Sequence, residues 1–257
     1  MPLRLAEYLL TNKDPKLQAC MNNLQIWIIP VLNPDGYAYT GDPNGDRYWR
    51  KNRRNNGDGT FGVDLNRNYG FEWGLNSGSS PNTNDETYRG PSPFSELEVA
   101  AFRDFVAVRH NPKAMLTYHT FTEQFLRPWS YTTCDPPGKP TLEYIVQDSI
   151  ARIDAVHGES YGESIGYLSS GEATDYFWNQ YRMATFTPEM RPATGGLDGF
   201  SPPPSQIIRN NEENLPAALA LINDAGCRSL WIKDYPATRA PNPPPFGRPP
   251  AGRRPSG

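Results

Sequence analysis

Histidine and cysteine are scarce in this chain, whose 257 residues include only 3 of each. The cysteines Cys20, Cys134 and Cys227 are widely spaced and form no CxxC pair. They allow at most one disulfide, so the sequence leaves the redox compartment open.

Long apolar runs and an excess of positive charge are also absent. No apolar stretch approaches the roughly 20 residues that a membrane-spanning helix needs. The net charge of -3 gives no reason to expect a nucleic acid as partner. The opening residues MPLRLAEYLL lack the small-residue cleavage site of a signal peptide and read as an amphipathic helix. We expect neither a membrane nor a nucleic acid as partner, and the localisation stays open.

The composition divides the chain into a globular part and a tail. A hydrophobic share of 37% is enough to build one sizeable core. From Pro236 onward, 8 of 22 residues are proline, accompanied by arginines and no acidic residue. Such a segment buries too little apolar surface to offset its ordering entropy. We therefore expect one domain over residues 1–235 and a disordered Pro/Arg-rich tail over residues 236–257.

Strand-like and helical patterns alternate along the globular part. Expected strands cover residues 24–33, 114–118 and 183–190, and expected helices cover residues 95–109, 141–156, 171–181 and 205–224. This alternation predicts an α/β fold with a mixed, mostly parallel central sheet flanked by helices.

Three local features refine these elements. Residues 24–33, LQIWIIPVLN, read as a strand buried on both faces, and the following NPDG reads as a turn. Ser95 and Glu98 have the spacing of a capping box at the start of a helix. Pro216 suggests that the last helix is interrupted or begins anew there.

Two polar residues occupy the carboxyl ends of expected strands, where functional groups gather in α/β sheets. His119 ends the strand-like run AMLTYHTF and is well placed to hold a metal. Glu189 lies in ATFTPEM, and a partly buried carboxylate there would have a raised pKa that suits a general base. A structural salt bridge from Glu189 to Arg191, on the same strand face, is an equal alternative.

Arginine and asparagine are concentrated in two loop segments. VDLNRNYG places Asn66 and Arg67 side by side, and a guanidinium can bind a carboxylate through two parallel hydrogen bonds. A polar turn that satisfies its own backbone is the alternative. RYWRKNRR offers an arginine for a developing oxyanion, or only a solvated loop. Tyr167 lies in a stretch that could close over a ligand or simply lie on the surface.

The order of these motifs carries more information than any one of them. NPDGYAYT, DRYWRKNRR, GVDLNRNYGFEW, TYHTF, a tyrosine loop and FTPEMRP follow one another over about residues 1–224. This succession resembles the zinc carboxypeptidases, typified by pancreatic carboxypeptidases A and B together with their bacterial relatives. We interpret the chain as a bacterial-like member.

The resemblance implies roles in metal binding and catalysis. His119 matches a zinc ligand, and Asp64 matches a carboxylate that orients a zinc-bound histidine. Glu189 matches the general base that activates water, and Arg50 matches the arginine that polarises the scissile carbonyl.

The resemblance also implies how a substrate is recognised. Asn66 and Arg67 match the pair that holds the C-terminal carboxylate of a peptide, and Tyr167 matches a tyrosine that folds over it. Arg47 resembles an outer arginine that contacts substrate. Thr174 matches the floor of the specificity pocket, which suggests a broad or small-polar preference. The implied partners are peptide or protein C-termini, and we expect a monomer.

One expected motif is missing. Zinc carboxypeptidases carry His-x-x-Glu, which supplies two zinc ligands, and neither His110 nor His157 has a glutamate three residues on. We expect this motif, with the first strands of the sheet, to lie upstream of Met1. Because catalytic zinc takes about three protein ligands, we predict weak or no zinc binding and an inactive fragment.

Two other hypotheses stay open. A non-catalytic module could bind peptide C-termini through Asn66, Arg67 and Tyr167, although such a module needs neither Glu189 nor Arg50. An enzyme with the same metal chemistry could instead act on another amide, such as a cell-wall peptide.

Overall fold

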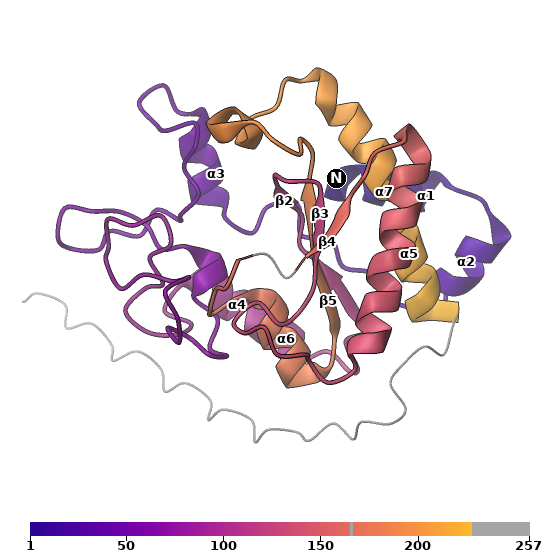
Figure 1. Ribbon diagram of the computed structural model, residues 1–257, viewed down its shortest axis with the longest axis horizontal. Helices are drawn as coiled ribbons and strands as arrows, with labels where there is room; N and C mark the ends of the chain where they lie inside the picture. Colours follow the sequence, from indigo (N-terminus) through magenta and orange to yellow (C-terminus); the bar gives the residue numbers. More distant parts are fainter. Residues whose placement is uncertain (165–166, 228–257) are drawn as a thin grey trace, which may run out of the picture.

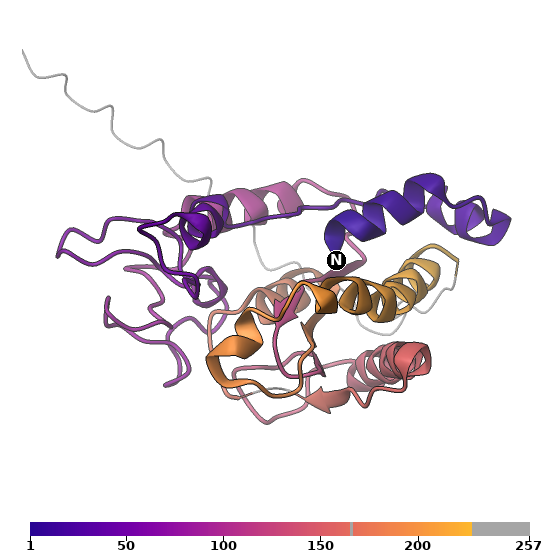
Figure 2. The same ribbon diagram turned by 90° about the horizontal axis from the view of Figure 1, so that it is seen from above.

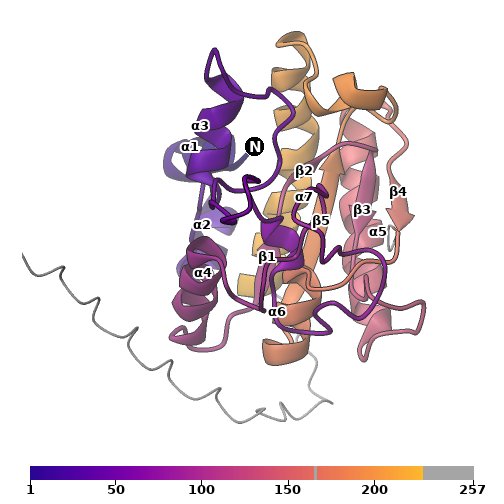
Figure 3. The same cartoon turned by 90° about the vertical axis from the view of Figure 1, so that its left-hand side faces the viewer.

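A mixed sheet forms the centre of the molecule. The computed structural model describes residues 1–164 and 167–227, so the expected tail over residues 236–257 lies outside the described residues. The strands are β1 (Ala114–Leu116), β2 (His119–Thr120), β3 (Gln124–Leu126), β4 (Gly162–Ser164) and β5 (Ala184–Met190). Figure 3 shows the order β1-β5-β3-β4, with β2 also paired to β5. Only the β3–β5 pairing is antiparallel among the described strands. The predicted mixed, mostly parallel sheet is therefore confirmed.

Helices flank this sheet. They are α1 (Pro2–Thr11), α2 (Pro15–Met21), α3 (Pro34–Gly41), α4 (Leu97–Ala107), α5 (Lys139–His157), α6 (Ala173–Tyr181) and α7 (Ser205–Cys227), with short 3-10 helices η1 (Leu65–Arg67) and η2 (Gly196–Phe200). Helices α5 and α7 lie side by side next to the strands, whereas the loop-rich residues 42–95 extend on the opposite side (Figure 1). Seen from above, α7 lies between α5 and the α1–α2 pair (Figure 2). No helix among the described residues is long and apolar enough to cross a membrane.

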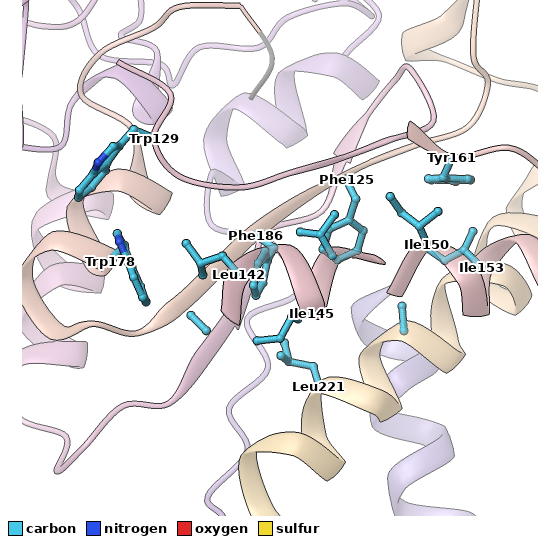
Figure 4. Packing of buried hydrophobic residues seen from close by; sticks show 13 residues of the cluster. Phe125, Trp129, Leu142, Ile145, Ile150, Ile153, Tyr161, Trp178, Phe186 and Leu221 are labelled. Atoms are coloured by element: carbon cyan, nitrogen blue, oxygen red, sulfur yellow. The ribbon is translucent and has the colours of Figure 1, made fainter. Parts of the chain in front are cut away.

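The main core lies between the sheet and the helices α5 and α7. Phe125 of β3 and Phe186 of β5 pack against Leu142 and Ile145 of α5 and Leu221 of α7 (Figure 4). Buried residues recur every one to three positions along α5 from Leu142 to Ile153, so one face of that helix is covered by the core. A second cluster joins α4 and α6 to the segment around η1. The second cluster fixes the loop that carries the candidate substrate-binding residues.

One disulfide, Cys20–Cys227, connects α2 to the end of α7 across 207 residues of sequence. Cys134 is free and exposed. The sequence allowed one disulfide without indicating this pair.

The prediction of a strand over residues 24–33 is wrong. This segment is extended, but none of its residues belongs to a strand. Leu24, Ile26 and Ile28 pack against the cluster formed by α1 and α7, whereas Trp27 and Ile29 are 55% and 42% exposed. Side chains therefore alternate between this cluster and the other side of the segment, where Trp27 contacts Phe105 of α4 with ring centroids 5.0 Å apart. No backbone hydrogen bond holds residues 25–32 among the described residues.

Three smaller predictions are also corrected. NPDG does not form an isolated turn, because Asn33 caps α3 by accepting a hydrogen bond from the Gly36 backbone N–H at 3.0 Å. The capping box is absent, because α4 begins at Leu97 with Glu96 as its N-cap residue. Helix α7 continues through Pro216 without interruption.

Candidate functional site

His119 and Glu189 come together at the end of the sheet. They are direct partners across the parallel β2–β5 pairing, and His119 Nδ1 lies 3.6 Å from Glu189 Oε1. Arg191 does not pair with Glu189, because its guanidinium binds Glu213 at 3.0 Å and Glu159 at 2.5 Å. The alternative of a structural Glu189–Arg191 salt bridge is therefore wrong.

The surroundings of Glu189 favour its protonated form. Burial, supported by the negative charge of Glu172, raises the pKa of Glu189 from 4.5 to about 7, against the effect of Arg50 and Arg67. Its Oε2 atom is buried and accepts no hydrogen bond from the described residues. A carboxyl group with a pKa near neutral and a free oxygen is suited to accept and return a proton. Burial also lowers the pKa of His119, which favours the neutral imidazole that can bind a metal.

Arg50 lies beside this pair and is held by Asp64. Its Nη2 donates to Asp64 Oδ2 at 2.8 Å, and the arginine side chain remains 38% exposed. The other oxygen of Asp64 accepts from the Asn66 backbone N–H at 3.0 Å, which fixes the start of η1. In the described part of the chain the carboxylate of Asp64 thus holds an arginine and a backbone amide, and no histidine bonds to it.

Arg67 is almost completely buried and its donors are nearly all in use. Nε donates to the Gly78 carbonyl oxygen at 2.7 Å, and Nη1 donates to the Asn66 carbonyl oxygen at 2.8 Å. Nη1 also donates to Glu172 Oε1 at 3.1 Å, and Nη2 donates to the Tyr167 hydroxyl. Since the side chain is only 2% exposed, a ligand that reaches this guanidinium must share or replace one of these partners.

Asn66 and Tyr167 complete the group around Arg67. The Oδ1 atom of Asn66 accepts from the Ala173 backbone N–H at 3.0 Å, which ties η1 to the start of α6. Its Nδ2 group makes no hydrogen bond to the described residues and is available to a ligand. Tyr167 is 63% exposed and reaches Arg67 through its hydroxyl and its ring, whose centroid lies 5.6 Å from the Arg67 guanidinium carbon. Asn66, Arg67 and Tyr167 therefore meet at one place.

Arg47 does not join them. Its guanidinium donates from Nε to the Ser201 hydroxyl at 2.7 Å, next to η2, and the neighbouring Tyr48 donates its hydroxyl to Asp198 at 3.1 Å. Arg47 is exposed. The structure thus places it on a peripheral loop and bonds it to none of the other candidate residues.

The sequence reasoning missed Glu172. This residue is the N-cap of α6, and its negative charge raises the pKa of both Arg67 and Glu189. Gly171 before it has φ +76°, and a Cβ there would lie 2.4 Å from the Arg67 carbonyl oxygen. A glycine followed by a carboxylate at the start of a buried helix was the available signal. Thr174 is only 3% exposed, inside the same helix.

The described residues do not form a complete zinc site. Within residues 1–164 and 167–227, no group of three or more His, Cys, Asp or Glu side chains could hold a metal ion. His119 is the ligand that the sequence predicts, and His157 is engaged at the end of α5 with Glu212 at 3.1 Å. Because catalytic zinc takes about three protein ligands, the described residues by themselves do not fit the metal.

Comparison with known proteins gives a consistent result. The zinc carboxypeptidase family matches residues 1–217. Carboxypeptidase A1 of Rattus norvegicus is 37% identical over 216 residues, which are 82% of this chain and 50% of that protein. Human carboxypeptidase O is 34% identical over 235 residues, covering 89% of this chain and 61% of that protein. The chain thus spans about half the length of such relatives.

Comparison with solved structures agrees with the family match. Bovine thrombin-activatable fibrinolysis inhibitor, in complex with a tick carboxypeptidase inhibitor, superposes with a TM-score of 0.70 and 31% identity, over 77% of this chain and 68% of that one. Carboxypeptidase A from Helicoverpa armigera superposes with a TM-score of 0.67 and 32% identity, over 77% of this chain and 50% of that one. These relatives are animal proteins, so the closer similarity to bacterial members stays a prediction. The motifs, the fold and these similarities together lead to one conclusion: the chain belongs to the zinc carboxypeptidase family.

Proposed function

We propose that the site binds the free C-terminal carboxylate of a peptide at Arg67, with Asn66 and Tyr167 as further contacts. The observation that carries this proposal is the buried guanidinium of Arg67, whose charge also acts on Glu189. A buried arginine with an adjacent free amide N–H group suits a carboxylate ligand. The peptide bond next to a carboxylate held there would lie towards Glu189 and Arg50.

The chemistry that these residues could perform is removal of the C-terminal residue. Glu189 would take a proton from water and return it to the leaving amine, because its raised pKa balances both steps. Arg50 would stabilise negative charge on the carbonyl oxygen. Hydrolysis in this family depends on zinc, for which His119 is the one ligand that we propose among the described residues. We therefore propose peptide binding with weak or no zinc binding, and no hydrolysis by this chain alone.

A non-catalytic binding module is the second candidate. It is favoured by the lack of a three-ligand group among the described residues. The buried, unpartnered oxygen of Glu189 counts against it, because a binding module gains nothing from a carboxylate that is costly to bury.

Calorimetry with a blocked dipeptide tests the proposed binding. A benzoyl-glycyl dipeptide with a free C-terminal carboxylate should bind, and its C-terminal amide should bind at least about tenfold more weakly, since a charge-assisted hydrogen bond is lost. Arg67→Gln should abolish the difference between acid and amide. Arg152→Gln is the matched control, because Arg152 also forms an ion pair, at 2.7 Å to Asp148, but lies on α5. Equal binding of acid and amide to the wild-type chain would refute the proposal.

Zinc content and hydrolysis separate the two candidates. The purified chain should contain far less than one equivalent of zinc after dialysis, and it should not cleave the dipeptide. Cleavage that a chelator abolishes would show that the metal ligands have been misassigned.

A further inference from the structure

Arg53 differs from the two arginines on either side of it in the sequence. Arg50 pairs with Asp64 at 2.8 Å, and Arg54 pairs with Glu96 at 2.7 Å. Arg53 forms no ion pair and no hydrogen bond through its side chain with the described residues. Its guanidinium group is therefore a cation whose hydrogen-bond donors are not used within the described part of the chain.

Aromatic rings hold this guanidinium group instead. Its carbon atom lies 3.6 Å from the ring centroid of Tyr39, 4.6 Å from that of Trp49 and 4.9 Å from that of Phe61. A separation of 3.6 Å is that of two planar groups in van der Waals contact, so the guanidinium stacks on Tyr39. All three rings are close enough for cation–π attraction. We call Arg53 and these three rings the Arg53 cage.

The fold holds the three rings in place. Tyr39 belongs to α3, and its ring meets the Trp49 ring edge to face, with centroids 5.3 Å apart. Trp49 Nε1 donates to the Asn52 carbonyl oxygen at 3.0 Å. Phe61 is fixed by an antiparallel bridge to Asn55. The guanidinium is therefore pre-organised, and it loses less conformational freedom on binding a ligand than an unrestrained arginine does.

The hydrogen-bond donors of Arg53 remain accessible. Stacking uses the faces of a guanidinium group, whereas its N–H groups lie in the plane and point outward from its edge. None of its three nitrogen atoms is among the buried, unpartnered side-chain atoms of the described residues, and none makes a hydrogen bond there. Each nitrogen can therefore be reached by water or by a ligand.

Acidic residues of the neighbouring loops do not pair with this cation. Asp42 and Asp46 each accept a hydrogen bond from a backbone N–H of their own turn, at 2.7 and 2.9 Å. Asp58 accepts from the Thr83 hydroxyl at 2.7 Å. A single unpaired arginine suits one carboxylate rather than a polyanion, which needs several free cations in a row. Phe61, which is 39% exposed, adds an apolar surface beside it.

We propose that the Arg53 cage is a second binding site, which takes the side-chain carboxylate of an aspartate or glutamate in a partner protein. The carboxylate accepts two hydrogen bonds from the edge of the guanidinium, and an apolar residue next to it packs on Phe61. This site recognises an acidic side chain and not a chain terminus. The inference therefore does not depend on the function proposed for Arg67.

Nuclear magnetic resonance on the full chain tests this site with a peptide that is blocked at both ends. The probe is acetyl-Gly-Phe-Glu-Phe-Gly-amide, and the same peptide with glutamine in place of glutamate is its uncharged counterpart. Titration of isotope-labelled protein should shift the indole N–H signal of Trp49, which Trp49→Phe assigns. The glutamate peptide should bind about fivefold more tightly than the glutamine peptide, as expected for one partly exposed, charge-assisted pair.

Substitutions show whether this preference arises at Arg53. Arg53→Gln should bring the two peptides to within about twofold of each other. Arg53→Lys keeps the charge without the planar fork and should retain only part of the preference. Tyr39→Leu removes the stacked ring and should also reduce it, because the guanidinium is no longer pre-organised. Unchanged indole signals from the other tryptophans show that each variant is folded.

Lys16→Gln is the matched control. Lys16 is an exposed cation on α2, away from α3 (Figure 1), and its loss changes the net charge as Arg53→Gln does. This variant should keep the full preference of the wild type. A loss of the preference in Lys16→Gln would assign it to net charge alone and would overturn the proposal.

Three other results also overturn the proposal. They are equal binding of the two peptides to the wild-type chain, a preference that persists in Arg53→Gln, and a Trp49 signal that the glutamate peptide leaves unmoved. None of them bears on Arg67, because the probe has no terminal carboxylate.

Discussion

Replacing Glu189 with glutamine should stabilise the protein, and only at neutral to alkaline pH. The folded state raises the pKa of Glu189 from 4.5 to about 7, mainly through burial. The folded protein thus keeps the proton up to about pH 7, whereas the unfolded chain releases it near pH 4.5. Stability is therefore lost as the pH rises through this window, because the folded state binds more protons than the unfolded state. Glutamine is neutral throughout and avoids this loss.

The size of the effect follows from the two pKa values. At about 1.4 kcal/mol per pH unit, the difference between 4.5 and about 7 corresponds to about 3 kcal/mol. The side chain is still 18% exposed, and contact with water reduces the cost of the charge. We expect Glu189→Gln to be about 2 kcal/mol more stable than the wild type at pH 8 and within about 0.5 kcal/mol of it at pH 4.5.

Urea unfolding followed by tryptophan fluorescence measures this difference, and the chain offers 6 tryptophans as probes. A chelator in all samples removes any influence of bound metal. Glu7→Gln, on the exposed part of α1, is the control and should remain within about 0.5 kcal/mol of the wild type at both pH values. A Glu189→Gln variant with the same stability difference at both pH values, or with lower stability at pH 8, would refute the reasoning.

Three further predictions concern the framework of the site. Reduction of the Cys20–Cys227 disulfide should lower the free energy of unfolding by about 2–4 kcal/mol, because this disulfide closes a long loop. Urea midpoints with and without reductant measure the change. Cys134→Ser, at an exposed position, is the control and should not alter the midpoint. Phe186→Ala should cost about 3–5 kcal/mol, because the ring is fully buried in the main core; a loss below about 1 kcal/mol in the same assay would contradict the packing described. Gly171→Ala should cost more than about 1 kcal/mol and also weaken dipeptide binding, since φ is +76° and the new Cβ would press on the Arg67 carbonyl oxygen; thermal unfolding and calorimetry on the same sample check both effects.

The sequence predicted best those elements whose pattern is set by a buried face. The helix expected over residues 141–156 corresponds to α5, and the strand expected over residues 183–190 corresponds to β5. In both, apolar residues meet the main core at the spacing that the element requires. His119 and Glu189 were predicted for the same reason, because each lies at the carboxyl end of an apolar run that is visible in the sequence.

The predictions that failed concern features that depend on contacts with residues elsewhere in the fold. Residues 24–33 have the composition of a strand, but a strand also needs a neighbour with which to pair, and composition does not specify one. Asn33 and Pro34 suit both a turn and the first positions of a helix, and α3 is the outcome. Glu172 was not predicted because it belongs to the site through its contact with Arg67, which is 105 residues away in the sequence.

The extended segment over residues 25–32 also affects how the protein will behave in solution. Its backbone N–H and C=O groups have no backbone partner among the described residues, and Ile29 and Val31 are each 42% exposed. An open row of donors and acceptors beside apolar side chains is a template for pairing with another extended chain. Self-association at high concentration is the natural result, and calorimetry on this chain is therefore best performed dilute, with light scattering recorded alongside.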